Sequence, residues 1–107
     1  MYDKATSISR RGVIKGQLTR LGSYAKNFST ADGDINQLKI RKQKAQEFWD
    51  EFQQIQQEIE QNEDAESEED YRIEFEELYF DVVASCETLI EKRKMLSVKK
   101  EMKTKMH

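Results

Sequence analysis

The apolar side chains of this chain recur every three or four residues over almost its whole length. A spacing that averages 3.5 residues places one apolar stripe along one side of an α-helix. Strand-type alternation is absent, and the chain contains no proline that would interrupt a helix. Three segments carry this spacing: Ile14, Leu18, Leu21, Ala25 and Phe28; then Ile35, Leu38, Ala45, Phe48, Phe52, Ile55 and Ile59; then Tyr71, Phe75, Leu78, Val82, Leu89 and Leu96. The sequence therefore predicts an all-α fold.

The breaks between the three stripes indicate where the helices begin and end. Residues 29–33 (Ser-Thr-Ala-Asp-Gly) are typical of a turn. Asp34, three residues before Gln37, resembles a capping box, which satisfies free N–H groups of a first helical turn. We expect three helices and a basic C-terminal tail, at about 6–28, 34–62, 68–98 and 99–107.

Short connections between helices favour antiparallel neighbours. We therefore expect a single domain, residues 1–107, that forms an antiparallel three-helix bundle. In this bundle the second and third helices form a long coiled-coil hairpin. Folding the hairpin about residues 62–67 places Phe52 near Leu78, and Ile55 near Phe75.

The composition excludes several classes of protein. One cysteine, Cys86, cannot form an internal disulfide framework, and one cysteine with one histidine cannot supply the four ligands of an ordinary structural zinc site. No apolar run approaches the roughly 20 residues that span a bilayer. The first residues also lack the apolar core of a secretory signal. We expect a soluble, intracellular chain, cytoplasmic or nuclear, with no membrane, metal or cofactor requirement.

No catalytic constellation is visible. Gly12 and Gly16 lack the spacing of a phosphate-binding loop; they either allow another helix to approach closely or merely weaken the first turns. Cys86 lies beside the third apolar stripe, where a buried apolar role is more common than that of a nucleophile. The acidic pairs resemble solvated surface, because an acid–base dyad needs two different environments. We expect no enzymatic activity and no small-molecule substrate.

Charge is distributed in three blocks behind a net charge of only −3. Residues 1–46 hold ten basic and three acidic side chains, residues 47–81 one basic and fifteen acidic, and residues 82–107 seven basic and three acidic. Pairing of the helices would match part of this charge inside the molecule. Arg10, Arg11 and Lys15 would lie near Asp50 and Glu51, and Lys39 and Lys42 would lie opposite Glu87 and Glu91. The acidic hairpin tip, residues 58–70, and the basic tail are expected to remain unmatched, as opposite poles of a long molecule.

Six aromatic rings are expected near one level of the hairpin: Phe48, Trp49, Phe52, Phe75, Tyr79 and Phe80. Adjacent residues of a helix cannot face the same way, so Phe48 and Trp49 should point toward different neighbours. Either the bundle buries all the rings, or some form an exposed patch that faces a second copy of the chain. The residues assigned to a protein interface are Phe48, Trp49, Phe52, Tyr79, Phe80 and Val83.

The basic C-terminal segment is a second candidate surface. Its side chains could hold nucleic-acid phosphates, with an affinity that falls as salt rises. The chain is net acidic, however, and no aromatic residue alternates with these lysines for base stacking. Weak RNA binding is therefore the second hypothesis, through Lys92, Arg93, Lys94, Lys99, Lys100, Lys103 and Lys105.

Three stretches also follow one another in an informative order. They read Arg-Gly-Val-Ile-Lys-Gly-Gln-Leu-Thr-Arg-Leu-Gly (11–22), Phe-Trp-Asp-Glu-Phe-Gln-Gln-Ile-Gln-Gln-Glu-Ile-Glu (48–60) and Tyr-Arg-Ile-Glu-Phe-Glu-Glu-Leu-Tyr-Phe (71–80). Together they resemble the N-terminal region of Gag-like polyproteins of BEL/Pao-type LTR retrotransposons. The matching residues are Arg11, Ile14, Lys15, Leu18, Thr19 and Arg20, then Trp49, Phe52, Ile55, Gln56 and Ile59, then Phe75, Glu76 and Tyr79. The resemblance covers about residues 8–90 and includes neither the zinc knuckle nor the protease of a complete element.

The resemblance implies a role in Gag-type self-assembly or in holding partners, without enzymatic activity. The leading hypothesis is thus a structural domain that forms homo-oligomers by helix–helix packing. Two alternatives stay open: a nucleic-acid-binding helical module, and a domesticated Gag-derived adaptor that binds a partner protein.

Overall fold

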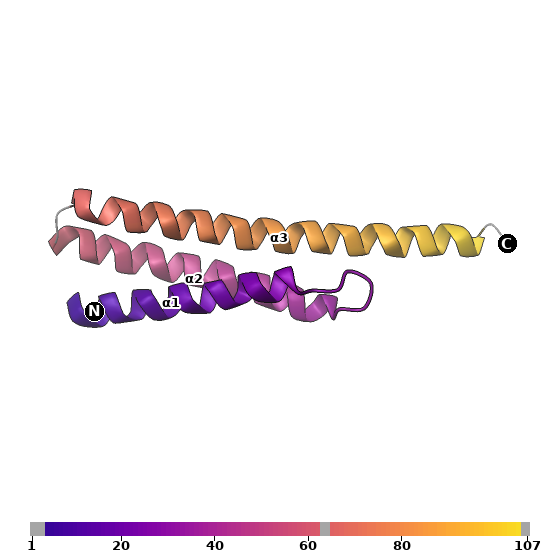
Figure 1. The fold of residues 1–107 in the computed structure, drawn as a ribbon, viewed down its shortest axis with the longest axis horizontal. Helices are drawn as coiled ribbons and strands as arrows, with labels where there is room; N and C mark the ends of the chain where they lie inside the picture. The colour runs from indigo at the N-terminus through magenta and orange to yellow at the C-terminus, as the bar shows by residue number, and fades with distance from the viewer. Residues whose placement is uncertain (1–3, 63–64, 106–107) are drawn as a thin grey trace.

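Three helices that all contact one another make up the bundle. The computed structural model describes the backbone of residues 4–62 and 65–105, and the side chains of residues 4–61 and 68–99. The helices are α1 (Lys4–Lys26), α2 (Ile35–Asn62) and α3 (Ala65–Lys105), and these residues contain no strand. α2 runs antiparallel to both α1 and α3 (Figure 1), and every helix pair is in contact. The predicted all-α, antiparallel three-helix bundle with a long α2–α3 hairpin is confirmed.

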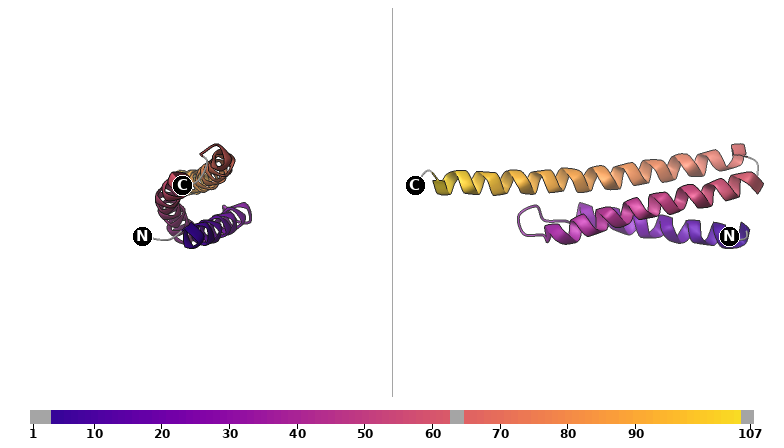
Figure 2. Two further views of the ribbon diagram at one scale, coloured as in Figure 1. Left: turned by 90° about the vertical axis from the view of Figure 1, so that its left-hand side faces the viewer. Right: turned by 180° about the vertical axis from the view of Figure 1, so that it is seen from behind.

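α3 is longer than predicted and projects beyond the other two helices. Its 41 residues continue to Lys105, so residues 99–105 are helical and not an extended tail. No glycine or proline follows position 98, and Lys, Glu and Met all favour helix, so no stop signal ends it there. Figure 1 and the right-hand view of Figure 2 show this projection, which gives the molecule its long axis of 67 Å.

The connection between α1 and α2 is held by side chains from both sides. Asp34 caps α2, because its Oδ1 accepts hydrogen bonds from the backbone N–H groups of Asn36 (3.0 Å) and Gln37 (3.3 Å). From α3, the guanidinium of Arg93 donates to the backbone carbonyls of Thr30 (2.6 Å) and Gly33. The loop is therefore attached to α3 as well as to its own helices.

The core follows the predicted stripes. The rings of Phe52 and Phe75 stack with centroids 3.8 Å apart, and a neighbouring pair, Trp49 on Tyr79, stacks at 4.5 Å. Phe75 thus packs on Phe52, three residues from Ile55 on the same inward stripe of α2. The buried apolar residues are Ile14, Leu18, Leu21, Ala25, Leu38, Ala45, Phe48, Phe52, Ile55, Ile59, Phe75, Val82 and Cys86.

The close approach of two helices occurs at a different glycine from those singled out in the sequence. A Cβ atom placed on Gly12 or Gly16 would have no atom within 4 Å, so neither glycine supports a helix crossing. At Gly22 the same atom would lie 3.2 Å from Cγ2 of Val82. The tight contact between α1 and α3 is thus at Gly22, and the other two glycines only lower the helix propensity of α1.

Candidate functional site

Three rings form a partly exposed cluster on the α2–α3 hairpin, which we call the aromatic patch: Trp49, Tyr79 and Phe80. Their centroids lie 4.5 Å (Trp49–Tyr79), 5.6 Å (Trp49–Phe80) and 5.5 Å (Tyr79–Phe80) apart. Phe80 is 56% exposed, whereas Trp49 and Tyr79 are half-buried. An apolar ring exposed to this extent, and continuous with two others, is available to a partner surface.

Two of the six residues predicted at an interface are in the core instead. Phe52 is 0% exposed and stacks on Phe75, and Phe48 is also buried. The helical period explains this correction, because positions 48 and 52 share the inward stripe of α2 with Ala45. Trp49, one residue further on, lies against the rings of α3, so adjacent Phe48 and Trp49 do face different ways as predicted.

Val83 is half-buried beside the core and borders the aromatic patch along the chain. Acidic groups also lie near the patch. Burial raises the pKa of Tyr79, and the negative charges of Asp50 and Glu87 raise it further. The Tyr79 phenol is therefore neutral at physiological pH, and the patch is an uncharged surface with carboxylates at its border.

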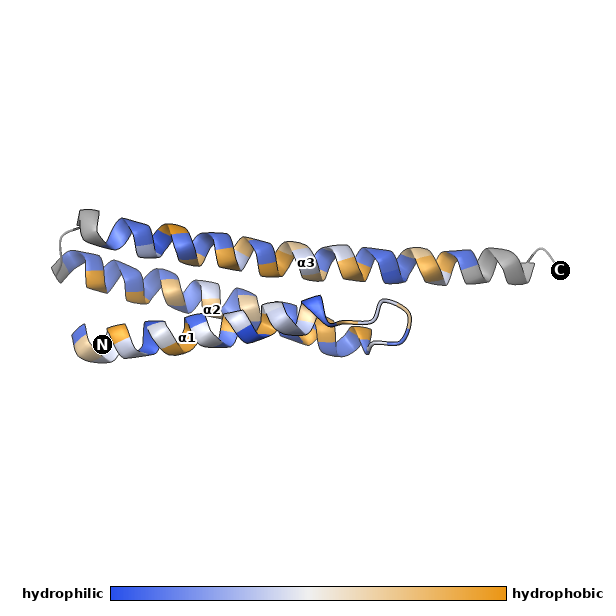
Figure 3. Ribbon diagram, viewed as in Figure 1, coloured by the Kyte–Doolittle hydropathy of each residue, from blue (hydrophilic) through white to orange (hydrophobic). Residues whose placement is uncertain are grey.

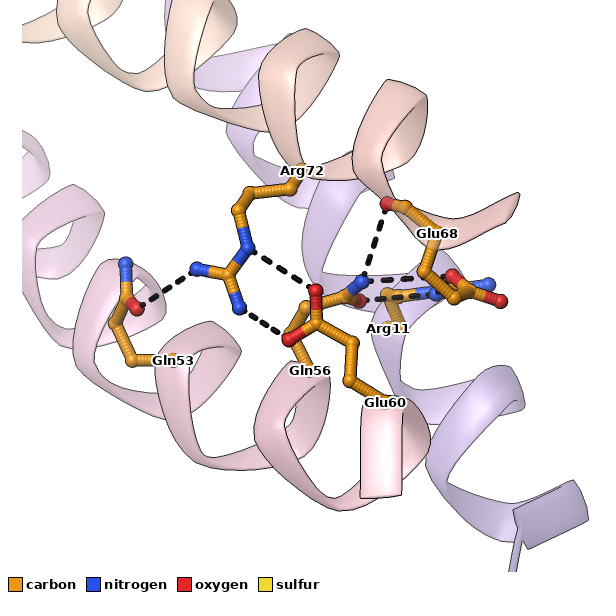
Figure 4. Close-up of polar contacts among 6 residues, drawn as sticks. All are labelled: Arg11, Gln53, Gln56, Glu60, Glu68 and Arg72. Carbon is orange, nitrogen blue, oxygen red and sulfur yellow. Dashed lines mark hydrogen bonds and ion pairs between the residues drawn. The ribbon is translucent and has the colours of Figure 1, made fainter. Parts of the chain in front are cut away.

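Two arginines neutralise acidic residues near the hairpin tip (Figure 4). Arg11 of α1 donates to Oε1 of Gln56 (2.9 Å) and to Oε2 of Glu68 (2.6 Å), and its guanidinium lies 3.8 Å from the centroid of the Tyr71 ring. Arg72 of α3 binds both carboxylate oxygens of Glu60. The expectation that the tip acids remain unmatched is thus wrong for Glu60 and Glu68.

The other predicted ion pairs are partly present. Lys42 pairs with Glu87 (3.2 Å) as expected. Glu51 is bound by Arg10 at 2.5 and 2.8 Å, as expected, whereas Arg11 turns inward to Gln56 and Glu68. One residue of difference on α1 is about 100° around the helix, so adjacent arginines necessarily serve different partners.

Acid should weaken this fold through two of these pairs. The hydrogen bond from Arg10 lowers the pKa of Glu51 below 4.5, and the hydrogen bond from Arg72 does the same for Glu60, against an opposing effect of burial. A carboxylate with a lowered folded-state pKa contributes stability above its unfolded pKa and loses it as the pH falls through the folded value.

We therefore expect the free energy of unfolding to fall on acidification below about pH 4.5. The variant Arg10→Gln/Arg72→Gln should lose less stability than the natural chain between neutral pH and about pH 3, as measured by urea unfolding. Lys39→Gln is the control, since Lys39 is an exposed cation of α2 that contributes to the lowered pKa of neither Glu51 nor Glu60. Equal acid sensitivity of all three chains would contradict this assignment.

One residue of the predicted nucleic-acid surface, Arg93, is bound inside the molecule. Arg93 is occupied by the carbonyls of the α1–α2 loop, so its role is to hold that loop. Lys92, Lys94 and Lys99 are exposed on the projecting part of α3. The side chains of Lys100, Lys103 and Lys105 lie outside the described residues, although the backbone there is helical.

The groups that could carry chemistry are not brought together. Cys86 is buried, and burial raises the pKa of its thiol. Among the side chains that the structure describes, no group of three or more His, Cys, Asp or Glu residues is arranged to hold a metal ion. An open pocket of about 750 Å³ lies at the α1–α2 turn between Arg20 and Arg41, over Tyr24 and Phe28.

The chain was compared with protein-family models, curated proteins and solved structures, and none of them matches. The resemblance to the BEL/Pao-type Gag-like region therefore depends on the three sequence elements alone. No described helix is long and apolar enough to cross a membrane.

The outer face of α3 is a further candidate surface, which the core-facing apolar stripes do not predict. Ile73, Met95 and Val98 are exposed there (45%, 57% and 53%), in addition to Phe80. The signal in the sequence is a second, weaker 3-4 spacing, offset from the core stripe of Phe75 and Val82. Figure 3 shows that hydrophobic bands continue along α3 where it projects beyond α1 and α2.

Proposed function

We propose that this chain is a structural self-association module, the N-terminal region of a BEL/Pao-type Gag-like polyprotein, that acts by helix–helix packing. The single observation that carries the proposal is the aromatic patch, where Phe80 stands 56% exposed against Trp49 and Tyr79. Single exposed apolar residues are ordinary on protein surfaces, but contiguous rings mark association sites.

The energetics favour a partner of similar character. Full burial of one phenylalanine side chain is worth about 1.5–3 kcal/mol, and two copies would each contribute one. Residues 94–99 of α3, whose side chains are all exposed, also lie on the part of this helix that projects beyond α1 and α2 (Figure 1). A second copy that covers this helix would bury Met95 and Val98 as well.

Light scattering after size-exclusion chromatography tests the proposal. The natural chain should form a discrete homo-oligomer at micromolar to millimolar concentration. The variant Phe80→Ser should shift toward monomer, because it removes the exposed ring without touching the core. Ile40→Ser is the matched control, since Ile40 is a similarly exposed apolar residue on α2, and it should leave the mass unchanged.

A chain that stays monomeric at every concentration, in low and in high salt, would overturn self-association. If such a monomer bound RNA at low salt with a steep salt dependence, the basic segment would become the functional surface. Lys92, Lys94 and Lys99 are the exposed side chains that support this second candidate.

A further inference from the structure

The outer face of α3 carries a heptad-like stripe between Ile73 and Val98. Successive residues of a helix differ by about 100° in direction, so positions 73, 77, 80, 84, 87, 91, 95 and 98 share one side. The core residues Phe75, Val82 and Cys86 face the opposite side. Every residue of the outer stripe is exposed, and it spans 25 residue steps, or about 38 Å of helix.

The charge along α3 reverses about its middle. Residues 68–81 hold seven acidic side chains and one basic, and residues 92–105 hold seven basic and one acidic. These two segments are equal in length and lie at equal distances from residues 86 and 87. A second copy laid antiparallel along α3 would therefore place each acidic segment on a basic one, whereas a parallel copy would place like charges together.

We infer that two copies of this chain pair through the outer faces of their α3 helices, antiparallel, about a two-fold axis near Glu87 and Thr88. The inference rests on the proposed self-association and adds its geometry. In this register Phe80 lies opposite Met95 of the second copy. Around the stripe, Asp81 lies near Lys92 of the second copy, and Glu77 lies near its Lys99; all four of these side chains are exposed.

The charge at the middle of the stripe, beside the two-fold axis, is also compatible with this pairing. Glu87 and Glu91 are the two carboxylates of the stripe nearest the axis, and that of Glu87 is already paired with Lys42 of its own chain at 3.2 Å. This internal pairing reduces repulsion between the two symmetry-related carboxylates. A two-fold pair of this kind is closed, because each copy presents the same surface to the other.

Disulfide trapping tests the geometry, in a Cys86→Ala background that removes the native thiol. A disulfide needs Cα atoms within about 7 Å. Glu87→Cys should be trapped as a covalent dimer on oxidation, because position 87 lies beside the axis. Met95→Cys should remain uncoupled, because the two copies of position 95 would be 15 residue steps, or about 22 Å, apart. A parallel pair would trap both variants equally.

A charge exchange in the natural background gives an independent readout. Asp81→Lys should weaken the dimer about tenfold, and adding Lys92→Asp should restore it, because the two positions face each other only in the antiparallel pair. If the natural chain associates but Glu87→Cys is not trapped and the exchange does not restore affinity, the α3 pairing is wrong and self-association stands. If the natural chain is monomeric, both fail.

Discussion

Replacing Phe52 with alanine should lower the free energy of unfolding by about 3–5 kcal/mol, the range for deleting a buried aromatic ring. The ring of Phe52 is 0% exposed and stacks on Phe75 at 3.8 Å, with Trp49 and Tyr71 within 6.4 Å of it, measured between ring centroids. Its removal would open a cavity where the aromatic rings of α2 pack against those of α3. Urea unfolding followed by circular dichroism measures the loss.

Phe80→Ala is the matched control for this prediction. It removes the same ring from the same hairpin, but at a position that is more than half exposed, so the cost to the folded monomer should be below about 1 kcal/mol. Both variants need to be compared at several protein concentrations, because association also stabilises the folded state. Similar losses for Phe52→Ala and Phe80→Ala would show that the hairpin is not held by this stack.

Replacing Arg11 with alanine should lower the free energy of unfolding by about 2–4 kcal/mol, although Arg11 is charged and not part of the apolar core. Its side chain is buried between three helices, where it donates to Gln56 and Glu68 and lies over Tyr71. Without it, the partly buried carboxylate of Glu68 would face the acidic hairpin tip unpaired. Breaking one side of a buried ion pair is costly for this reason.

Two further chains separate the ion pair from general disruption of α1. Lys15→Ala removes a neighbouring cation whose partner, Glu74, is largely exposed, so it should cost no more than about 1 kcal/mol. In the Arg11→Ala chain, adding Glu68→Gln should recover part of the loss, because it removes the unpaired charge. If Glu68→Gln makes the Arg11→Ala chain less stable still, the charge of Glu68 is not the source of the cost.

Much of the fold was predictable from the sequence, because helix formation depends on local spacing. The stripe from Ile14 to Ala25 and the cap at Asp34 lie where the period and the turn signal place them. The end of α3 was not predictable in the same way. No glycine or proline marks a stop beyond Val98, and a change from apolar to basic composition does not by itself end a helix.

The candidate interface was only partly predictable. Phe48, Phe52 and Phe80 are chemically identical in the sequence, yet two are buried and one is exposed. Which rings remain outside depends on how far α3 slides along α2, and stacking of Phe75 on Phe52 decides that register. The role of Arg93 was likewise hidden, because its acceptors are backbone carbonyls 60 and 63 residues away.

The sequence by itself determined that the chain forms three helices, that consecutive helices are antiparallel, and that acidic and basic blocks alternate along the chain. Periodicity, capping and short connections act over a few residues, so they can be read without a structure. Only the tertiary structure decided which cations meet which carboxylates, which rings are buried and which face of α3 remains uncovered. These depend on the rotation and register of one helix against another, and a shift of one residue turns a side chain by about 100°.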